Sequence, residues 1–148
     1  MVRRVQTIAD YQFGPGTGVR MFSDGCEFTL SRTGRIRQVL HEGKRLATVR
    51  AEDGRLTLGI EGALRLKEAL APPAYRVAIN PEVAEFVKAG KNAFARHVMA
   101  ADPAIRAGDE VLVTGENDEL LATGSAMMSG EEMLAFNYGV AVKVRQGR

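Results

Sequence analysis

The sequence is poor in the residues that build disulfides, metal centres and membrane spans. Cys26 is the only cysteine among 148 residues, so the chain forms no internal disulfide and offers no set of thiolates for zinc. His41 and His97 are the only histidines, and neither has a second ligand at metal-binding spacing. No run approaches the roughly 18 apolar residues of a membrane span. We therefore expect no metal, no cofactor and no membrane contact, and a reducing cytoplasm as the setting.

A catalytic constellation is also missing. Hydrolases and transferases need a nucleophile beside a base, or two acids with separated proton affinities. The acid pairs 109–110 and 131–132 are sequence neighbours that point apart on a strand, so we expect them in solvated turns. A structural role is favoured for the isolated Asp10. The glycine-dense loop 13–18 is interpreted as a turn, because a phosphate loop would also carry a lysine. The sequence predicts no enzyme.

What the second half does contain is one short helix among several strand patterns. Asn80 is the predicted cap, Pro81 takes the first helical position, and Gly90 supplies the left-handed residue that ends many helices. The three- and four-residue spacing of the apolar residues between them predicts a core face made of Val83, Phe86 and Val87.

The rest of this half reads as strands around a core. Alternating patterns predict strands at 75–79, 91–99, 110–114, 120–128 and 139–145. The methionines at 127, 128 and 133 fit a barrel core, although methionine also lines RNA grooves. The pattern predicts a small, mostly β barrel.

The first half predicts a separate, smaller α+β domain. A hairpin is indicated at 35–40 and 45–50, followed by a strand at 55–58 and an amphipathic helix at 61–70. Pro72 and Pro73 cannot continue that helix. We therefore predict an α+β chain of two domains, residues 1–72 and 73–148.

Charge is unevenly distributed between the two halves. The whole chain carries a net charge of +2, but residues 1–72 carry +4 and residues 73–148 carry −2. In the second half most acids gather in 109–119 and at 131–132, away from the basic residues that follow the helix and lie in the last strand. Such local basic regions attract phosphate groups, and this attraction falls steeply with salt.

Several strings in the second half together resemble one family. They are the helix followed by Gly90-Lys91-Asn92, the turn 105–111, the strand Ala122-Thr123-Gly124-Ser125-Ala126 and the ending Gly139-Val140-Ala141-Val142. In this order and spacing they resemble a PUA domain, an RNA-binding module. The resemblance covers about half of the chain and implies a β pseudo-barrel.

The resemblance also implies where RNA would bind. In PUA domains the helix end, the loop after it and the next strand form an RNA-facing surface, with the last strand beside them. Lys91 and Arg96 suit phosphates, Asn92 suits a base edge or ribose hydroxyl, and Phe94 suits stacking on an unpaired base. Phe94 is equally compatible with a place in the core, and His97 with a structural role. The implied RNA-binding residues are Lys88, Gly90, Lys91, Asn92, Phe94, Arg96, Lys143 and Arg145.

The first half extends the match. Residues 9–14 and 31–37 resemble the domain that precedes the PUA domain in archaeal archaeosine tRNA-guanine transglycosylases. The catalytic aspartates and zinc of that family lie in a separate (β/α)8 barrel of roughly 250 residues, which does not fit in this chain.

The implied function is non-catalytic binding of tRNA, at its acceptor stem and 3′ end, in support of tRNA modification. Three alternatives stay open: a translation-associated factor that binds tRNA on the ribosome, a subunit of a separately encoded tRNA-modifying enzyme, and a protein-interaction module. Arg32, Arg35, Arg37 and Arg45 of the predicted hairpin would extend the RNA surface, dock a partner or lie on a solvated face.

Overall fold

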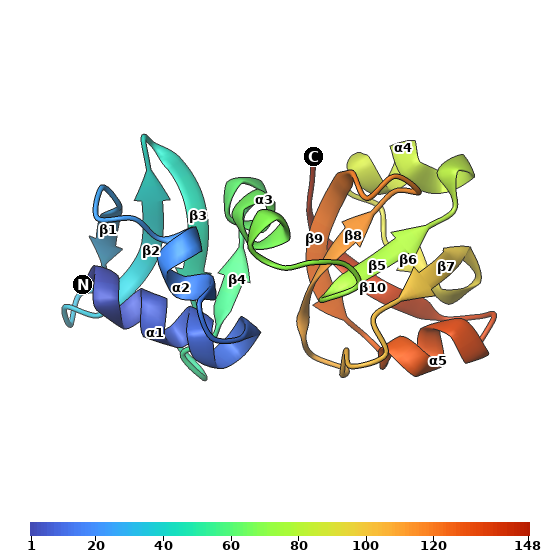
Figure 1. Cartoon of the computed structure of the whole chain (residues 1–148), viewed down its shortest axis with the longest axis horizontal. Coiled ribbons are helices and arrows are strands. Elements are labelled where there is room, and N and C mark those ends of the chain that lie inside the picture. The colour runs from blue at the N-terminus through green and yellow to red at the C-terminus, as the bar shows by residue number, and fades with distance from the viewer. The chain divides into compact units, whose positions relative to one another are not determined.

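The chain forms two compact units. The computed structural model describes residues 1–148 and divides them into Met1–Leu70 and Ala71–Arg148 (Figure 1). The last helix of the first unit, α3 (Ile60–Ala69), stops before the two prolines at 72 and 73. Proline has no backbone N–H and its ring clashes with the preceding turn, so a helix cannot run on through this segment. None of the helices has the length and apolar character needed to cross a membrane.

The first unit is a four-stranded antiparallel sheet with three helices. Strands β1 (Glu27–Leu30), β2 (Ile36–His41), β3 (Lys44–Val49) and β4 (Leu56–Leu58) lie side by side in chain order. The predicted hairpin is present, because β2 and β3 pair antiparallel and close through Glu42 and Gly43. Helix α3 follows the last strand, as expected, and the α+β class of this unit is confirmed.

Two helices at the start of the chain are not among the predicted elements. They are α1 (Val2–Phe13) and α2 (Thr17–Met21). Helix α1 buries Val5, Ala9 and Phe13, spaced four residues apart, against the unit. It begins without a capping side chain and without an acid in its first turn, so the usual signals of a helix start are absent.

The side chain of Gln12 ties α1 to the edge of the sheet. Its amide nitrogen donates to the Leu56 carbonyl at 3.0 Å, and its amide oxygen accepts from the Leu56 N–H at 2.7 Å. One side chain thereby satisfies both backbone groups of an edge-strand residue. The acid Asp10 has the structural role that was expected, since its carboxylate accepts the Gly18 N–H at 2.7 Å.

The second unit is a six-stranded sheet with short helical segments. In chain order it comprises β5 (Arg76–Ile79), the 3-10 turn η1 (Pro81–Val83), α4 (Ala84–Lys88), β6 (Ala93–Phe94), the 3-10 turn η2 (Ala95–His97), β7 (Val98–Ala101), β8 (Glu110–Thr114), β9 (Leu120–Ala126), α5 (Gly130–Ala135) and β10 (Val140–Gly147). The strands lie in the order β6-β10-β9-β8-β5-β7, and only the β5–β8 pair is parallel.

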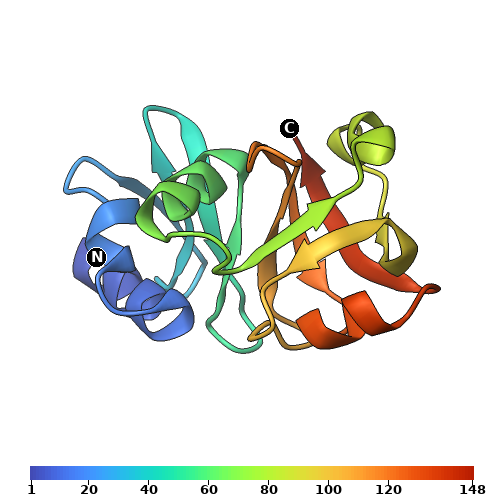
Figure 2. The same ribbon diagram turned by 45° about the vertical axis from the view of Figure 1, so that its right-hand side comes forward.

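This sheet must close on itself. Strands β6 and β7 lie at its opposite edges, yet only the three residues of η2 separate them in sequence. A link of that length spans at most about 14 Å when fully extended. The two edges are therefore drawn together, and the sheet curls around its contents, as Figure 2 shows. The predicted mostly β pseudo-barrel is confirmed.

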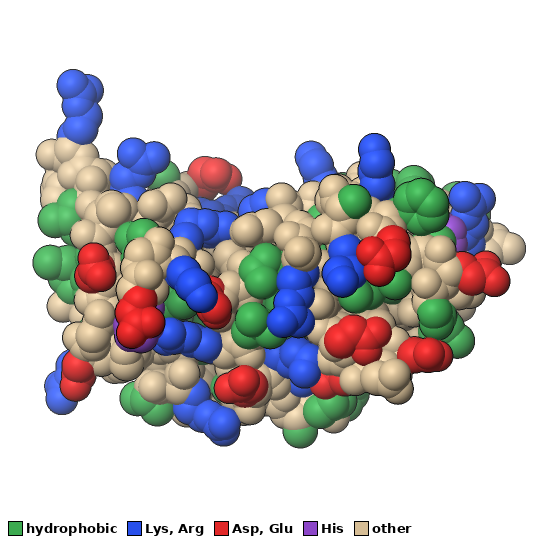
Figure 3. All heavy atoms as spheres, turned by 90° about the horizontal axis from the view of Figure 1, so that it is seen from above, with side chains coloured by type: hydrophobic (Ala, Val, Ile, Leu, Met, Phe, Trp, Pro, Cys, Tyr) green, Lys and Arg blue, Asp and Glu red, His purple; other side chains and the backbone are tan.

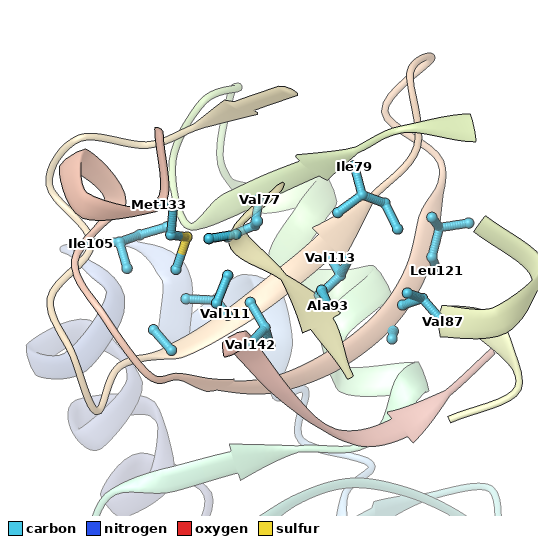
Figure 4. Close-up of a cluster of buried hydrophobic side chains, with 14 residues drawn as sticks. Val77, Ile79, Val87, Ala93, Ile105, Val111, Val113, Leu121, Met133 and Val142 are labelled. Carbon is cyan, nitrogen blue, oxygen red and sulfur yellow. The ribbon is translucent and has the colours of Figure 1, made fainter. Parts of the chain in front are cut away.

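Apolar side chains from almost every element fill the barrel. Val111 and Val113 of β8 enter it with Val77 and Ile79 of β5, and Met133 of α5 plugs it (Figure 4). All five are fully buried. Of the three methionines assigned to the core, Met133 fits, Met128 packs only partly against it, and Met127 is 52% exposed.

The helix after Asn80 starts and stops as predicted, but its core face is smaller. The Asn80 side chain accepts the Glu82 N–H at 2.9 Å, and Gly90 has a φ of +103°. Val87 is buried, whereas Phe86 is 62% exposed, so its assignment to the core is wrong. The segment begins as a 3-10 turn with about three residues per turn, and this shifts every later side chain from the face that a regular α-helix predicts.

Two further segments differ from expectation. The strand predicted at 91–99 is broken by η2, which turns the chain between the two sheet edges. Residues 129–136, for which no type was predicted, contain helix α5. Its start is a complete capping box in which Ser129 and Glu132 each accept the other's backbone N–H. Ser-x-x-Glu is a known sequence signature of a helix start.

Neighbouring residues of α5 allow a test of the barrel core. Replacing the fully buried Met133 with alanine leaves a cavity and should lower the free energy of unfolding by about 2–5 kcal/mol. Leu134→Ala removes a side chain that is 54% exposed, and its cost should stay within about 0.5 kcal/mol. Urea unfolding of both variants measures the difference, and equal losses would contradict the assigned core.

Candidate nucleic-acid interface

The end of α4, the loop after it and β6 run along the last strand. The β6 residues Ala93 and Phe94 pair with Val142 and Val140 of β10. Beyond β6, the Ala95 N–H donates to the Gly139 carbonyl at 2.9 Å. Residues 88–96 and 139–147 therefore form one continuous surface, here called the β6–β10 strip. The structure brings together the two segments that were expected to share an RNA-binding face.

Gly147 fixes the far end of the strip. A Cβ atom at this position would lie 2.0 Å from the carbonyl oxygen of Lys88 and 3.0 Å from the backbone nitrogen of Gly90. Only glycine permits this approach of the last strand to the helix end. Arg148 follows directly, and its N–H donates to the Leu121 carbonyl at 2.8 Å. Arg148, outside the predicted set, thus lies beside the predicted Lys88 and Gly90.

Three lysines of the strip carry charges that no acid neutralises. Lys91 and Lys143 are exposed and Lys88 is half-buried, and none of them forms an ion pair. On the face seen in Figure 3, Lys and Arg side chains of this unit stand along the upper margin, and others lie lower, beside Asp and Glu side chains. Unpaired ammonium groups beside one another produce a positive field that favours anionic ligands.

Arg145 differs from these lysines because it already forms an ion pair. Its guanidinium Nη1 lies 2.5 Å from a carboxylate oxygen of Glu110, whose side chain is only 4% exposed. A buried carboxylate needs such a partner, since an isolated buried charge is very costly. Arg145 therefore holds β10 to β8 and contributes little positive field to the strip.

Asn92 also has a structural partner. Its side-chain oxygen accepts the Val144 N–H at 2.9 Å, beside the point where the register between β9 and β10 shifts. The irregularity leaves β10 with a backbone donor, and Asn92 supplies the acceptor. Asn92 thus has a structural role in addition to its predicted contact with a base edge or ribose hydroxyl.

Phe94 lies at the surface, which rules out the alternative that it belongs to the barrel core. Its side chain is 38% exposed and is not part of the barrel core. The guanidinium carbon of Arg96 lies 5.7 Å from the centre of the Phe94 ring, and the His97 ring meets that ring edge-on at 5.9 Å. Arg96 Nε also donates to His97 Nε2 at 3.4 Å. These contacts orient an aromatic face and a cation side by side.

A second aromatic pair near the strip was not predicted. Phe136 and Tyr138 stack with ring centres 5.9 Å apart and planes at 16°, and both are exposed. They precede Gly139, which bonds to Ala95, so they stand close along the chain to the Phe94 end of the strip. This pair could have been suspected from the sequence, because two aromatic residues occur close together just before the last strand.

The acids of this unit stabilise its turns. Asp109 accepts the Arg106 N–H at 2.9 Å, and Glu132 caps α5. Asp118 pairs with the buried Arg76 at 3.0 Å. No group of three or more His, Cys, Asp or Glu side chains is placed to hold a metal ion. Of the two acid pairs predicted in solvated turns, only Asp109 fits. Glu110 is buried in β8, where it pairs with Arg145, and Glu131 and Glu132 lie in the first turn of α5.

The structural role of Asn92 can be tested by substitution. Asn92→Ala leaves the half-buried Val144 N–H without its acceptor and should lower the free energy of unfolding by about 1–3 kcal/mol. Asn92→Asp keeps an oxygen at the same position and should retain most of that stability. Urea unfolding of the two variants is the measurement, and an unaffected alanine variant would show that the bond is dispensable.

Comparisons with known protein families match both units. The PUA domain model matches residues 75–148, and the model for the patch-forming domain C2 of tRNA-guanine transglycosylase matches residues 3–73. The tRNA-guanine(15) transglycosylase of Pyrococcus abyssi is 57% identical over 146 residues, which cover 99% of this chain and 25% of that enzyme. The chain thus spans about a quarter of the length of the curated relatives that it matches.

Solved structures show the same fold across nearly the whole chain. A hypothetical protein from Pyrococcus horikoshii OT3 superposes with a TM-score of 0.77 at 23% identity, covering 99% of this chain and 89% of that one. A conserved PUA domain protein from Thermoplasma acidophilum gives 0.67 at 18% identity, with 98% and 86% covered. With the closed sheet and the two matching models, these findings show that the chain belongs to the PUA domain family, joined to a domain C2 of the archaeal tRNA-guanine transglycosylase type.

Proposed function

We propose that this protein is a non-catalytic tRNA-binding protein that grips the acceptor stem and 3′ end in support of tRNA modification. The observation that carries the proposal is the β6–β10 strip, which joins unpaired lysines to an exposed aromatic ring on one surface. The archaeal relatives are tRNA-guanine(15) transglycosylases, and this chain aligns with a quarter of their length. The proposed setting is the cytoplasm, where tRNA is used.

The strip has groups suited to both parts of a tRNA end. Lys88, Lys91 and Lys143 supply charges for the phosphates of the stem. At Gly90 a Cβ atom would meet nothing within 4 Å, so RNA can reach the backbone there. Phe94, which contacts both Arg96 and His97, presents a ring on which an unpaired base can stack. A duplex end followed by a single strand matches this order of groups.

The proposed role excludes chemistry by the chain itself. Several acids of the second unit have structural roles, since Glu132 caps a helix, Asp109 closes a turn, and Asp118 and Glu110 pair with arginines; Asp10 of the first unit accepts a backbone N–H. A general acid or base must instead reach a substrate proton. The partner that modifies the bound tRNA is, in this proposal, a separate tRNA-modifying enzyme.

Binding to a tRNA transcript tests the phosphate contacts. Lys91→Ala combined with Arg96→Ala should weaken binding and reduce the slope of log affinity against log salt by about 1.5, because two phosphate contacts are lost. Arg106→Ala removes an exposed arginine outside the strip and is the matched control. Fluorescence anisotropy across a salt series measures both, and a control that loses as much slope per charge removed would contradict the strip as the site.

Phe94 allows the single-stranded contact to be tested separately. Stacking of one base is worth about 1–3 kcal/mol, so Phe94→Ala should weaken binding of intact tRNA by about 5- to 150-fold. Phe94→Tyr keeps an aromatic ring and should bind like the wild type. A transcript trimmed of its 3′ single strand should bind Phe94→Ala and wild type equally. Equal losses on both transcripts would place the ring elsewhere on the RNA.

A further inference from the structure

The first unit contains a hollow whose charged lining is entirely basic. Its volume is about 450 Å³, and it lies between the first turns of α1, the β1–β2 turn, β2 and the segment after β3. Four guanidinium groups line it together with two hydroxyls, and no carboxylate does. The polar lining residues are Arg4, Arg35, Arg37, Arg50, Ser31 and Thr33, here called the arginine pocket.

Three of these arginines have no acidic partner. Arg4, Arg35 and Arg37 are exposed and form no ion pair, whereas Arg50 pairs with Glu52 at 3.1 Å and Asp53 at 3.6 Å. The three unpaired groups come from α1, the β1–β2 turn and β2. The fold therefore gathers separate positive charges around one hollow, where they repel one another unless an anion lies between them.

The turn that carries Arg35 is held in a defined shape. The Ser31 hydroxyl accepts the Arg35 N–H at 3.1 Å and lies 3.1 Å from the Thr33 hydroxyl. The Ser31 N–H in turn donates to the Arg35 carbonyl at 2.7 Å. These bonds fix the backbone on which Arg35 is presented. A positioned guanidinium loses less freedom on binding than one on a mobile loop.

The apolar lining of the pocket strengthens its charges. The apolar residues Ile8, Ile36 and Val49 line the same hollow as the arginines. Low-polarity walls screen a charge less than water does, so the attraction for an anion is larger here than on an open surface. Guanidinium also binds phosphate through two parallel N–H bonds, which favours phosphate over other anions.

The arginine pocket includes only part of the arginine set that the hairpin pattern indicated. Arg35 and Arg37 belong to the pocket, but Arg45 donates to Thr48 at 3.0 Å and does not line it. Arg32 does not line it either, and Arg4 enters from a helix far away in sequence. The cations around the hollow are thus brought together by the fold of this unit rather than by one strand face.

We propose that the arginine pocket is a second RNA contact, which binds phosphodiester groups of the same RNA that the β6–β10 strip holds. This inference rests on the proposed function. Three unpaired guanidinium groups from three elements, spread over a hollow larger than a single phosphate, fit consecutive phosphates of a strand. The net charge of +4 in residues 1–72 favours the same ligand.

The test uses the full chain and a tRNA transcript. Arg4→Gln, Arg35→Gln and Arg37→Gln combined should reduce the slope of log affinity against log salt by about 2–3, since three phosphate contacts are lost. A matched triple variant, Arg20→Gln with Lys44→Gln and Lys67→Gln, removes three basic residues of this unit outside the pocket. Its slope should change by less than about 1. Thermal unfolding shows that both variants remain folded.

The outcomes separate the two proposals. If the wild type binds tRNA and both triple variants lose the same slope, the arginine pocket is overturned while the strip stands. If the wild type does not bind tRNA even at low salt, both are overturned. Titration with inorganic pyrophosphate is the third arm. Tight pyrophosphate binding that the pocket variant loses, with its tRNA slope unchanged, would assign the pocket to a small phosphate compound instead of RNA.

Discussion

Closure of the six-stranded sheet is the constraint on which the second unit depends. The turn η2 is too short to let β6 and β7 remain apart, so the sheet curls and its apolar faces meet inside. Helix α5 then covers the interior with Met133, and α4 does so with Val87. Closure also leaves β6 paired only with β10, and at this edge Phe94 is exposed while Ala93 and Ala95 enter the core. Closure of the sheet therefore produces both the barrel and the candidate site.

The basic residues of this protein fall into two groups, those paired with an acid and those without an acidic partner. Arg76 and Arg145 hold Asp118 and Glu110, and Arg50 holds Glu52 and Asp53, so these arginines stabilise the fold. The lysines of the β6–β10 strip and three arginines of the first unit remain unpaired. A net charge of +2 conceals this division. Phosphate recognition depends on local fields, and each unit provides one of its own.

The sequence predicted local structure correctly where that structure depends on the residues of a single turn. The Asn80 cap and the left-handed Gly90 were predicted because each satisfies or permits backbone geometry within a few residues. Ser129 and Glu132 have the spacing of a capping box, which also marks a helix start, but no helix was predicted there. Phe86 was misplaced because the periodic pattern assumed a regular helix, while the chain begins with a 3-10 turn.

The sequence by itself determined the fold class, the hairpin of the first unit and the segments that compose the β6–β10 strip, because turn residues and apolar periodicity act over short distances. Only the tertiary structure decided which side chains lack a partner within the protein and which are already paired. Asn92 is engaged by Val144, Arg145 by Glu110, and Arg4 meets Arg35 and Arg37 across a hollow. Each of these relations joins residues at least 30 positions apart, and a pairing over that distance follows from how the strands and helices pack, not from local spacing.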